Sequence, residues 1–260
     1  MSRLATILDH KRGEVEARRR RLPLSEIQSM AADADTVRPF LGSLVACPYP
    51  VGLIAEIKRA SPSAGAINTS LDVAETAQAY ERAGAQSLSV LTDERFFAGS
   101  DENLLIARRS CGLPCLRKDF VVDAYQIYEA RALGADAILL IVAALTPSEL
   151  SEFHALAEDL GMAALVEVHD EAEAEIAMTM TPPLVGINNR NLKTFEVDLA
   201  TTQRVAPLLN GEALVVSESG ISSPAHVDQV AAWGARAVLV GTAFCAAPDL
   251  ENEVRQVMRR

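Results

Sequence analysis

The chain has 260 residues and a formal net charge of −11 at pH 7. Its hydrophobic fraction of 49% and charged fraction of 23% are typical of a globular protein with a substantial core, neither disordered nor fibrous. The acidic balance argues against a nucleic-acid-binding surface. The sequence contains no apolar run of 18 residues and its N-terminus lacks an apolar signal segment, so we expect a cytoplasmic protein without a membrane partner.

Two residue types are scarce. The four cysteines form no CxxC pair and have no clustered histidines, so we expect neither a zinc site nor a disulfide framework. Lysine occurs at only four positions, and all other basic residues are arginines; the lysines are Lys11, Lys58, Lys118 and Lys193. Because an arginine does not release its proton near neutral pH, these lysines are the better candidates for proton transfer.

The first 46 residues are predicted to be helical. An amphipathic pattern covers 4–22, and a second helix over 24–34 follows Pro23. From residue 51 onward, short apolar runs alternate with helical stretches such as 73–83 and 147–160. Glycines precede most of these runs, where a helix would end with a left-handed residue; they are Gly84, Gly112, Gly134, Gly161, Gly211 and Gly234.

Eight apolar runs are predicted to be strands. They are rich in Val, Ile and Leu and nearly continuous, as in parallel strands covered on both faces; they span 51–57, 87–91, 113–117, 137–141, 164–168, 184–187, 213–216 and 237–240. Eight strand–helix units predict an α/β fold, a (βα)8 TIM barrel. We expect a single domain over 1–260, with a helical N-terminal extension (1–46) before the barrel (47–260). An open doubly wound sheet is the alternative, but no GxGxxG follows the first strand.

Charged and polar residues follow most of these runs, at the strand ends where such barrels carry their functional side chains. They are Glu56 and Lys58, Lys118, Glu167, Asn188 and Arg190, and Glu218. Burying so many charges costs several kcal/mol each unless they are paired, so an active site explains them better than a structural network. Alternating cations and carboxylates favour acid–base chemistry without a metal or cofactor.

The last two strands end in small residues with free backbone N–H groups and hydroxyls. Ser219-Gly220 follows the seventh run and Gly241-Thr242 follows the eighth. Barrels of this kind commonly bind a phosphate at these two loops. The sequence therefore predicts an anionic, phosphorylated small-molecule substrate.

Five strings, in this order, resemble the indole-3-glycerol phosphate synthase family. They are AEIKRASPS (55–63), LRKDF (116–120), VEVH (166–169), GINNRNL (186–192) and SESGI (217–221). The resemblance extends over essentially the whole chain. It implies a cofactor-free carboxy-lyase of tryptophan biosynthesis that closes the indole ring: 1-(2-carboxyphenylamino)-1-deoxyribulose 5-phosphate loses carbon dioxide and water to give indole-3-glycerol phosphate.

The resemblance also implies roles for individual residues. Lys118 would be the general acid for the ketone oxygen, and Glu167 the second acid–base residue. Lys58 would be a cation near the substrate's anionic groups and a second candidate proton donor. Glu56 would orient either Lys58 or the substrate nitrogen, and Asn188 would hydrogen-bond the reacting oxygens. The remaining implied contacts are with the sugar (Arg190 and Glu218), the phosphate (Ser219, Gly220, Gly241 and Thr242, with Ser61 nearby) and the aromatic ring (Phe120, with Phe97 and Leu139 as further candidates).

Two other functions remain open at this point. One is a different phosphosugar barrel enzyme of tryptophan biosynthesis; the other is a catalytically silent barrel used as a scaffold, which the intact charged set disfavours. We expect a small phosphosugar as the partner and a monomer or weak homodimer. His169, directly after the fifth strand, is expected to cap a helix or lie on the surface rather than to line the site.

Overall fold

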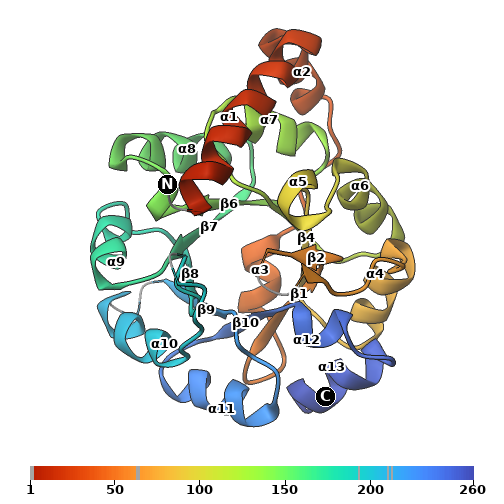
Figure 1. Ribbon diagram of the computed structural model, residues 1–260, viewed down its shortest axis with the longest axis vertical. Helices are drawn as coiled ribbons and strands as arrows, with labels where there is room; N and C mark the ends of the chain where they lie inside the picture. The colour runs from red at the N-terminus through yellow and green to blue at the C-terminus, as the bar shows by residue number, and fades with distance from the viewer. Residues whose placement is uncertain (1–2, 63–64, 193, 210, 212) are drawn as a thin grey trace.

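A computed structural model describes residues 3–62, 65–192, 194–209, 211 and 213–260. Eight parallel strands form a closed barrel, seen end-on in Figure 1, in which β1 pairs with both β4 and β10. The strands are β1 (Gly52–Ile57), β4 (Ser87–Leu91), β5 (Cys115–Lys118), β6 (Ala137–Ile141), β7 (Ala163–Val168), β8 (Leu184–Asn188), β9 (Leu214–Glu218) and β10 (Ala237–Val240). The predicted barrel is confirmed, and its closure excludes the open sheet.

The strand bounds differ from the prediction in ways that affect the site. β5 begins after Pro114, which has no N–H to donate to a neighbouring strand. β8 and β9 each run further than predicted, because Asn188 and Glu218 are still paired in register. These two side chains therefore stand on the strands themselves rather than in the loops beyond them.

The barrel interior is apolar below its mouth. Because alternate strand residues share a face, each charged residue at a strand end stands two positions after a buried interior one; the pairs are Ile54 and Glu56, Leu116 and Lys118, Leu165 and Glu167, and Val216 and Glu218. Helix α3 (Phe40–Val45) adds Phe40 and Leu44 to the same apolar cluster. The charged ends thus lie above a packed apolar layer.

Most of the helices that follow the strands cover the outside of the barrel, and two short ones, α5 (Glu94–Phe97) and α12 (Thr242–Cys245), lie at its mouth (Figure 1). The others are α4 (Val73–Arg82), α6 (Asp101–Ser110), α7 (Tyr125–Ala132), α8 (Pro147–Asp159), α9 (Glu171–Met178), α10 (Ala200–Val205), α11 (Pro224–Ala232) and α13 (Leu250–Met258), with the 3-10 turns η1 (Val142–Ala144) and η2 (Ala206–Leu209). A short hairpin, β2 (Ala60–Ser61) and β3 (Gly65–Ala66), follows β1. Among the described helices, none is long and apolar enough to cross a membrane.

The junction glycines largely behave as predicted. Gly84, Gly134, Gly161, Gly211 and Gly234 all have positive φ. The prediction for Gly112 was wrong: α6 ends at Ser110, Cys111 after it is extended, and Gly112 is not left-handed. Its N–H instead donates to the carboxylate of Glu81.

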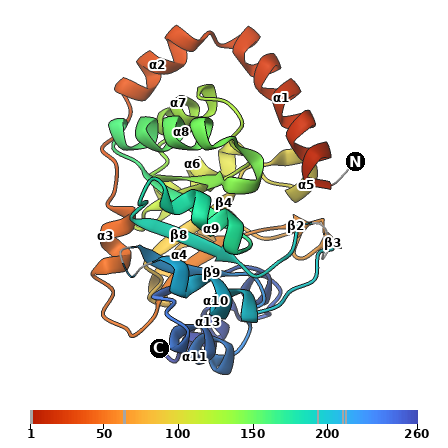
Figure 2. The same cartoon turned by 90° about the vertical axis from the view of Figure 1, so that its left-hand side faces the viewer.

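The N-terminal helices α1 (Arg3–Arg21) and α2 (Leu24–Ala32) project beyond the ring of barrel helices (Figures 1 and 2). Helix α2 packs against α7. Figure 2 shows the start of α1 at the same end of the barrel as the β2–β3 hairpin, with α3 at the opposite end. The extension therefore reaches both ends of the barrel.

Helix α1 is fixed to the barrel mouth by Lys11, which has no exposed surface. Its Nζ lies 2.9 Å from Asp119 Oδ1, 3.0 Å from Asp93 Oδ2 and 3.0 Å from Glu14 Oε2. Burial opposes the charge, but these carboxylates hold the pKa of Lys11 above its usual value. Because Asp119 directly follows Lys118, the anchor of α1 is one residue from a predicted catalytic group.

We expect Lys11→Met to lower the free energy of unfolding by about 3–5 kcal/mol, because it leaves Asp93 buried without its cation and Asp119 with only Arg117, 3.8 Å away. Urea unfolding followed by circular dichroism would measure the loss. Arg20→Met is the matched control, since Arg20 is on the same helix with a side chain 73% exposed, and it should change stability by less than about 0.5 kcal/mol. Equal effects of the two variants would contradict a buried anchor.

Candidate active site

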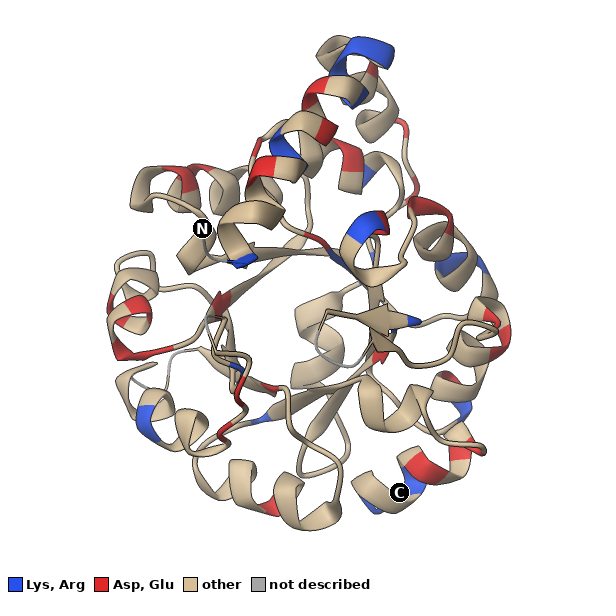
Figure 3. Ribbon diagram, in the orientation of Figure 1, with Lys and Arg blue, Asp and Glu red and all other residues tan. Residues whose placement is uncertain are grey.

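A cavity of about 420 Å³ lies at the carboxyl ends of the strands. Every site residue named from the sequence lines it: Glu56, Lys58, Ser61, Lys118, Phe120, Glu167, Asn188, Arg190, Glu218, Ser219, Gly220, Gly241 and Thr242. Figure 3 shows acidic and basic residues both on strands around the barrel opening and on the outer helices. The barrel topology thus gathers residues spread over nearly 190 positions of sequence around one space.

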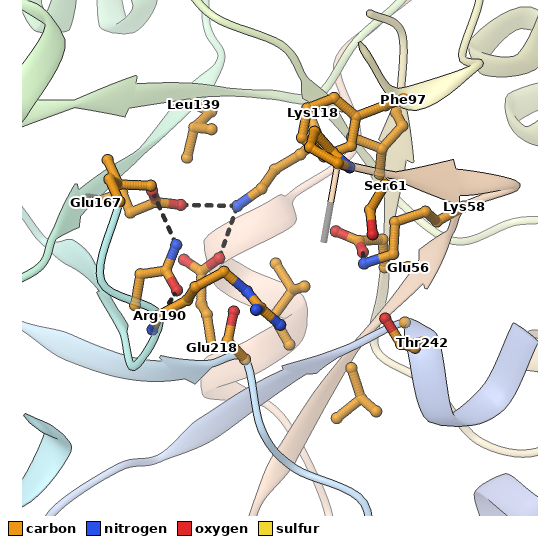
Figure 4. Close-up of a pocket in the computed structure, with 18 of the residues that line it drawn as sticks. Glu56, Lys58, Ser61, Phe97, Lys118, Leu139, Glu167, Arg190, Glu218 and Thr242 are labelled. Carbon is orange, nitrogen blue, oxygen red and sulfur yellow. Dashed lines mark hydrogen bonds and ion pairs between the residues drawn. The ribbon is translucent and has the colours of Figure 1, made fainter. Parts of the chain in front are cut away.

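Lys118 occupies the centre of one side of this cavity. Its Nζ lies 2.9 Å from Glu167 Oε2 and 2.6 Å from Glu218 Oε2 (Figure 4). The three groups come from β5, β7 and β9, and both carboxylates are nearly inaccessible to solvent. One ammonium is therefore shared by two buried carboxylates.

The two carboxyl groups respond oppositely to this environment. Burial favours the neutral form of each, but Lys118 and His169 hold the pKa of Glu167 well below its usual range. For Glu218, burial outweighs the attraction of Lys118, and with the repulsion of Glu167 it raises the pKa. The pair of carboxylates in turn keeps the pKa of Lys118 above its usual value against the effect of burial. Carboxyl groups with divergent pKa values and a charged lysine provide a proton acceptor and a proton donor side by side.

A second ion pair lies across the cavity (Figure 4). Lys58 Nζ is 2.5 Å from Glu56 Oε2, and Lys58 follows β1 while Glu56 is on it. The carboxylate of Glu56 fits there because Gly241 has no side chain: a Cβ on Gly241 would lie 2.5 Å from Glu56 Oε2. The pair places a second ammonium in the cavity at β1, two strands from Lys118 on β5.

Asn188 at the end of β8 contacts Glu167, and Arg190 follows two residues later. The amide of Asn188 donates to Glu167 Oε1 at 3.2 Å, and its own oxygen accepts the backbone N–H of Arg190 at 3.0 Å. The Arg190 guanidinium donates to the carbonyl of Phe195, 3.0 Å away. Asn188 is thereby held with its amide on the carboxylate, and Arg190 is held at the cavity rim.

The two loops predicted to bind phosphate lie on one side of the cavity. Ser219 and Gly220 both have positive φ, at 68° and 84°. A non-glycine residue in this region is uncommon and is often found at functional sites. The amide of the buried Asn189 stabilises the turn by donating to the carbonyl of Ser219 at 3.1 Å. Thr242 opens α12 directly after Gly241.

The cavity also has an apolar wall. The rings of Phe97 and Phe120 are 6.0 Å apart and tilted by 41°, and Leu139 also lines the cavity. Leu4 and Ile7 complete this wall from α1. Sequence reasoning did not include these two residues, because nothing in a helical pattern indicates which domain surface the helix covers.

Three further residues shape the site and were not identified from the sequence. Gly186 on β8 leaves the space that the carboxylate of Glu218 occupies, and Asn189 holds the Ser219 turn. The prediction for His169 was wrong: its ring is neither a cap nor on the surface but is buried behind Glu167, with 8% of the side chain exposed. Ser63 and Lys193, which belong to the motif and to the lysine set, lie outside the described residues.

Metal ligation has no candidate site within the described ranges, where His, Cys, Asp and Glu form no group of three or more suited to an ion. The cavity instead offers two ammonium groups, four carboxyl groups, hydroxyls and backbone N–H groups beside an aromatic wall. Such a set can bind an anionic aromatic molecule and move protons on it.

Comparison with known proteins agrees with this arrangement. The family described as indole-3-glycerol phosphate synthase matches residues 4–257. A protein of that name from Azoarcus sp. (strain BH72) is 52% identical over 244 residues, covering 92% of each chain. Another, from Neisseria meningitidis serogroup B, is 48% identical over 254 residues, covering 96% of this chain and 97% of the relative.

Solved structures show the same fold. A mutant tryptophan synthase alpha-subunit from Pyrococcus furiosus superposes with a TM-score of 0.61 at 16% identity, covering 80% of this chain and 98% of that one. At this identity the likeness concerns the barrel alone. The sequence matches, by contrast, span nearly the whole chain, and the chain therefore belongs to the indole-3-glycerol phosphate synthase family.

Proposed function

We propose that the protein closes the indole ring of 1-(2-carboxyphenylamino)-1-deoxyribulose 5-phosphate, giving indole-3-glycerol phosphate, carbon dioxide and water. The observation that carries this proposal is the position of Lys118 Nζ between the carboxylates of Glu167 and Glu218, inside a cavity with a phosphate-type turn and an aromatic wall. Family membership supplies the reaction, and the geometry supplies the groups that the reaction needs.

The first step needs a proton donor. An aromatic carbon of the substrate attacks its ketone carbon, and negative charge develops on the ketone oxygen. Lys118 donates a proton to that oxygen, while Glu167 and Glu218 hold its ammonium in place. The bond from the ring to the carboxylate then breaks, carbon dioxide leaves, and its electron pair returns to the ring system.

Dehydration needs a donor and an acceptor. The hydroxyl formed in the first step leaves as water with a proton from Lys58, which Glu56 orients. Glu167, whose pKa is held low, accepts the proton that the substrate loses as the double bond forms. Asn188 hydrogen-bonds Glu167 and the reacting oxygens.

The remaining contacts bind the substrate. Its phosphate rests on Ser219, Gly220, Gly241 and Thr242, near Ser61. Arg190 and Glu218 position the sugar, and Phe120 packs on the aromatic ring. We also propose that the protein acts on a small phosphosugar as a monomer or weak homodimer in the cytoplasm.

Incubating the protein with the carboxyphenylamino-deoxyribulose phosphate and recording indole fluorescence tests the proposal. We expect a fluorescence increase together with equimolar carbon dioxide release. Release of free indole from indole-3-glycerol phosphate would instead support a tryptophan synthase alpha-type lyase. No turnover of either compound by well-folded protein would support the silent scaffold and refute the proposal.

The phosphate contact of Thr242 can be tested separately. We expect Thr242→Ala to raise KM by about 5–10-fold with kcat nearly unchanged, because one hydrogen bond to a charged group is lost. Thr242→Ser is the matched control, since it keeps the hydroxyl and should bind substrate as the unsubstituted protein does. Steady-state kinetics with both variants gives the answer, and similar KM values for Ala and Ser would rule out the hydroxyl contact.

A further inference from the structure

His169 directly follows β7 and contacts Glu167 without lining the cavity. Its Nε2 is 3.2 Å from Glu167 Oε1, and its Nδ1 is 3.0 Å from Glu173 Oε2. Glu173 is in the first turn of α9, and the same Oε2 accepts the backbone N–H of His169 at 2.9 Å. The imidazole is thus fixed between a carboxylate of the active site and a carboxylate of the outer helix.

This arrangement determines the charge of the ring. A neutral imidazole has only one N–H, so one of its two nitrogens would direct a lone pair at a carboxylate. In a protonated ring, Nδ1 hydrogen-bonds Glu173 and the positively charged ring forms an ion pair with Glu167 through Nε2. Burial opposes this charge, but Glu167 and Glu173 outweigh it and raise the pKa of His169 to about 10.

Glu167 therefore has a cation near each oxygen. Its Oε2 faces Lys118, while its Oε1 faces His169 and the amide of Asn188. The charged groups facing the His169–Glu167 pair are Lys118 from β5, Glu218 from β9 and Glu173 from α9; η1, which packs on β7 and α9, carries no charged side chain. Lys118, Glu167, Asn188 and Glu218 line the cavity, whereas His169 and Glu173 do not.

We propose that His169, protonated and held by Glu173, is a positioning residue that keeps Glu167 ionised and oriented for proton transfer. This inference rests on the proposed function, in which Glu167 accepts a proton. Substrate would contact Glu167 and Lys118 but not His169. The outer helix α9 would thereby affect the chemistry through a chain of two carboxylates and one imidazolium.

The charge of the ring can be measured without substrate. In protein labelled at histidine, we expect the His169 ring, assigned by its absence in His169→Gln, to stay protonated above pH 8. Glu173→Gln should lower its pKa by at least about one unit, because it removes one of the two carboxylates. Glu175→Gln is the matched control, being exposed on the same helix, and should leave the titration unchanged. A ring that titrates between pH 6 and 7 in the unsubstituted protein would overturn the proposal.

Turnover gives the second readout. In His169→Gln we expect kcat to fall about 10–100-fold with KM within about threefold, and the acid limb of the kcat–pH profile to move to higher pH by about one unit. The limb moves to higher pH because Glu167 must be ionised to accept a proton, and removing the neighbouring cation raises the pKa of Glu167. Glu173→Gln leaves the ring protonated at the pH of that limb, so it should move the limb far less than His169→Gln, and Glu175→Gln should not move it.

A kcat loss in His169→Gln with an unmoved acid limb would reduce His169 to a packing role and refute the proposal. Failure of the proposed function would be seen differently, as no turnover by the unsubstituted protein at any pH. The ring titration would then still decide the charge of His169, because it needs no substrate.

Discussion

Replacing Lys118 with methionine is expected to lower kcat by about a thousandfold while substrate affinity stays within about tenfold. The ammonium contacts two carboxylates within the cavity and is positioned to donate its proton as charge develops on the ketone oxygen. An interaction made mainly in the transition state affects kcat rather than ground-state binding. Methionine retains the length of the side chain and so preserves packing against the neighbouring strands.

Single-turnover kinetics and equilibrium titration with the substrate would separate the two quantities. Lys58→Met is the informative comparison, because Lys58 also lines the cavity and pairs with Glu56, and it is expected to affect substrate binding as well as turnover. If Lys118→Met instead lost affinity and kept its turnover, Lys118 would be a binding residue and the assignment of the acid would be wrong.

The barrel and the membership of the site were predictable from the sequence for a physical reason. Parallel strands place all their carboxyl ends on one rim, so any charged residue that ends an apolar run must lie at that rim. Lys118, Glu167 and Glu218 follow this rule directly, and the structure brings them within ion-pair distance. No knowledge of the loops or of the helix packing is needed for that step.

The buried positions of Lys11 and His169 could not be predicted, because they depend on contacts between distant segments. Lys11 is one charged residue among many in an amphipathic helix, and only the approach of α1 to the loops after β4 and β5 buries it against Asp93 and Asp119. His169 likewise looks like an ordinary polar residue after a strand, until α9 places Glu173 on its far nitrogen. Neither burial can be inferred from local periodicity, because both are set by tertiary geometry.

Gly186 is a third residue whose role depends on a contact between distant segments. It is on the inner face of β8, beside the carboxylate of Glu218 on β9. A Cβ at this position would lie 2.1 Å from Glu218 Oε1, with Leu165 Cδ1 3.3 Å away on another side. The carboxylate must move to admit even one methyl group, and Lys118 is bonded to that carboxylate at 2.6 Å.

We therefore expect Gly186→Ala to lower kcat by about a hundredfold, as displacements of about 1 Å at a catalytic group typically do. Gly13→Ala is the matched control, because a Cβ on Gly13 meets nothing within 4 Å. It should leave turnover unchanged and stabilise α1 by up to about 1 kcal/mol. Steady-state kinetics and urea unfolding of both variants measure these effects.

A double-mutant cycle separates displacement of Glu218 from general damage to the barrel. In a Glu218→Ala background the space beside Gly186 is empty, so adding Gly186→Ala should change kcat by no more than about twofold. In protein that retains Glu218, Gly186→Ala should still lower kcat by about a hundredfold. If the kcat losses of Gly186→Ala and Glu218→Ala multiplied instead, the alanine would act by distorting strand β8. The absence of a side chain at Gly186 would then have no part in placing the carboxylate that holds Lys118.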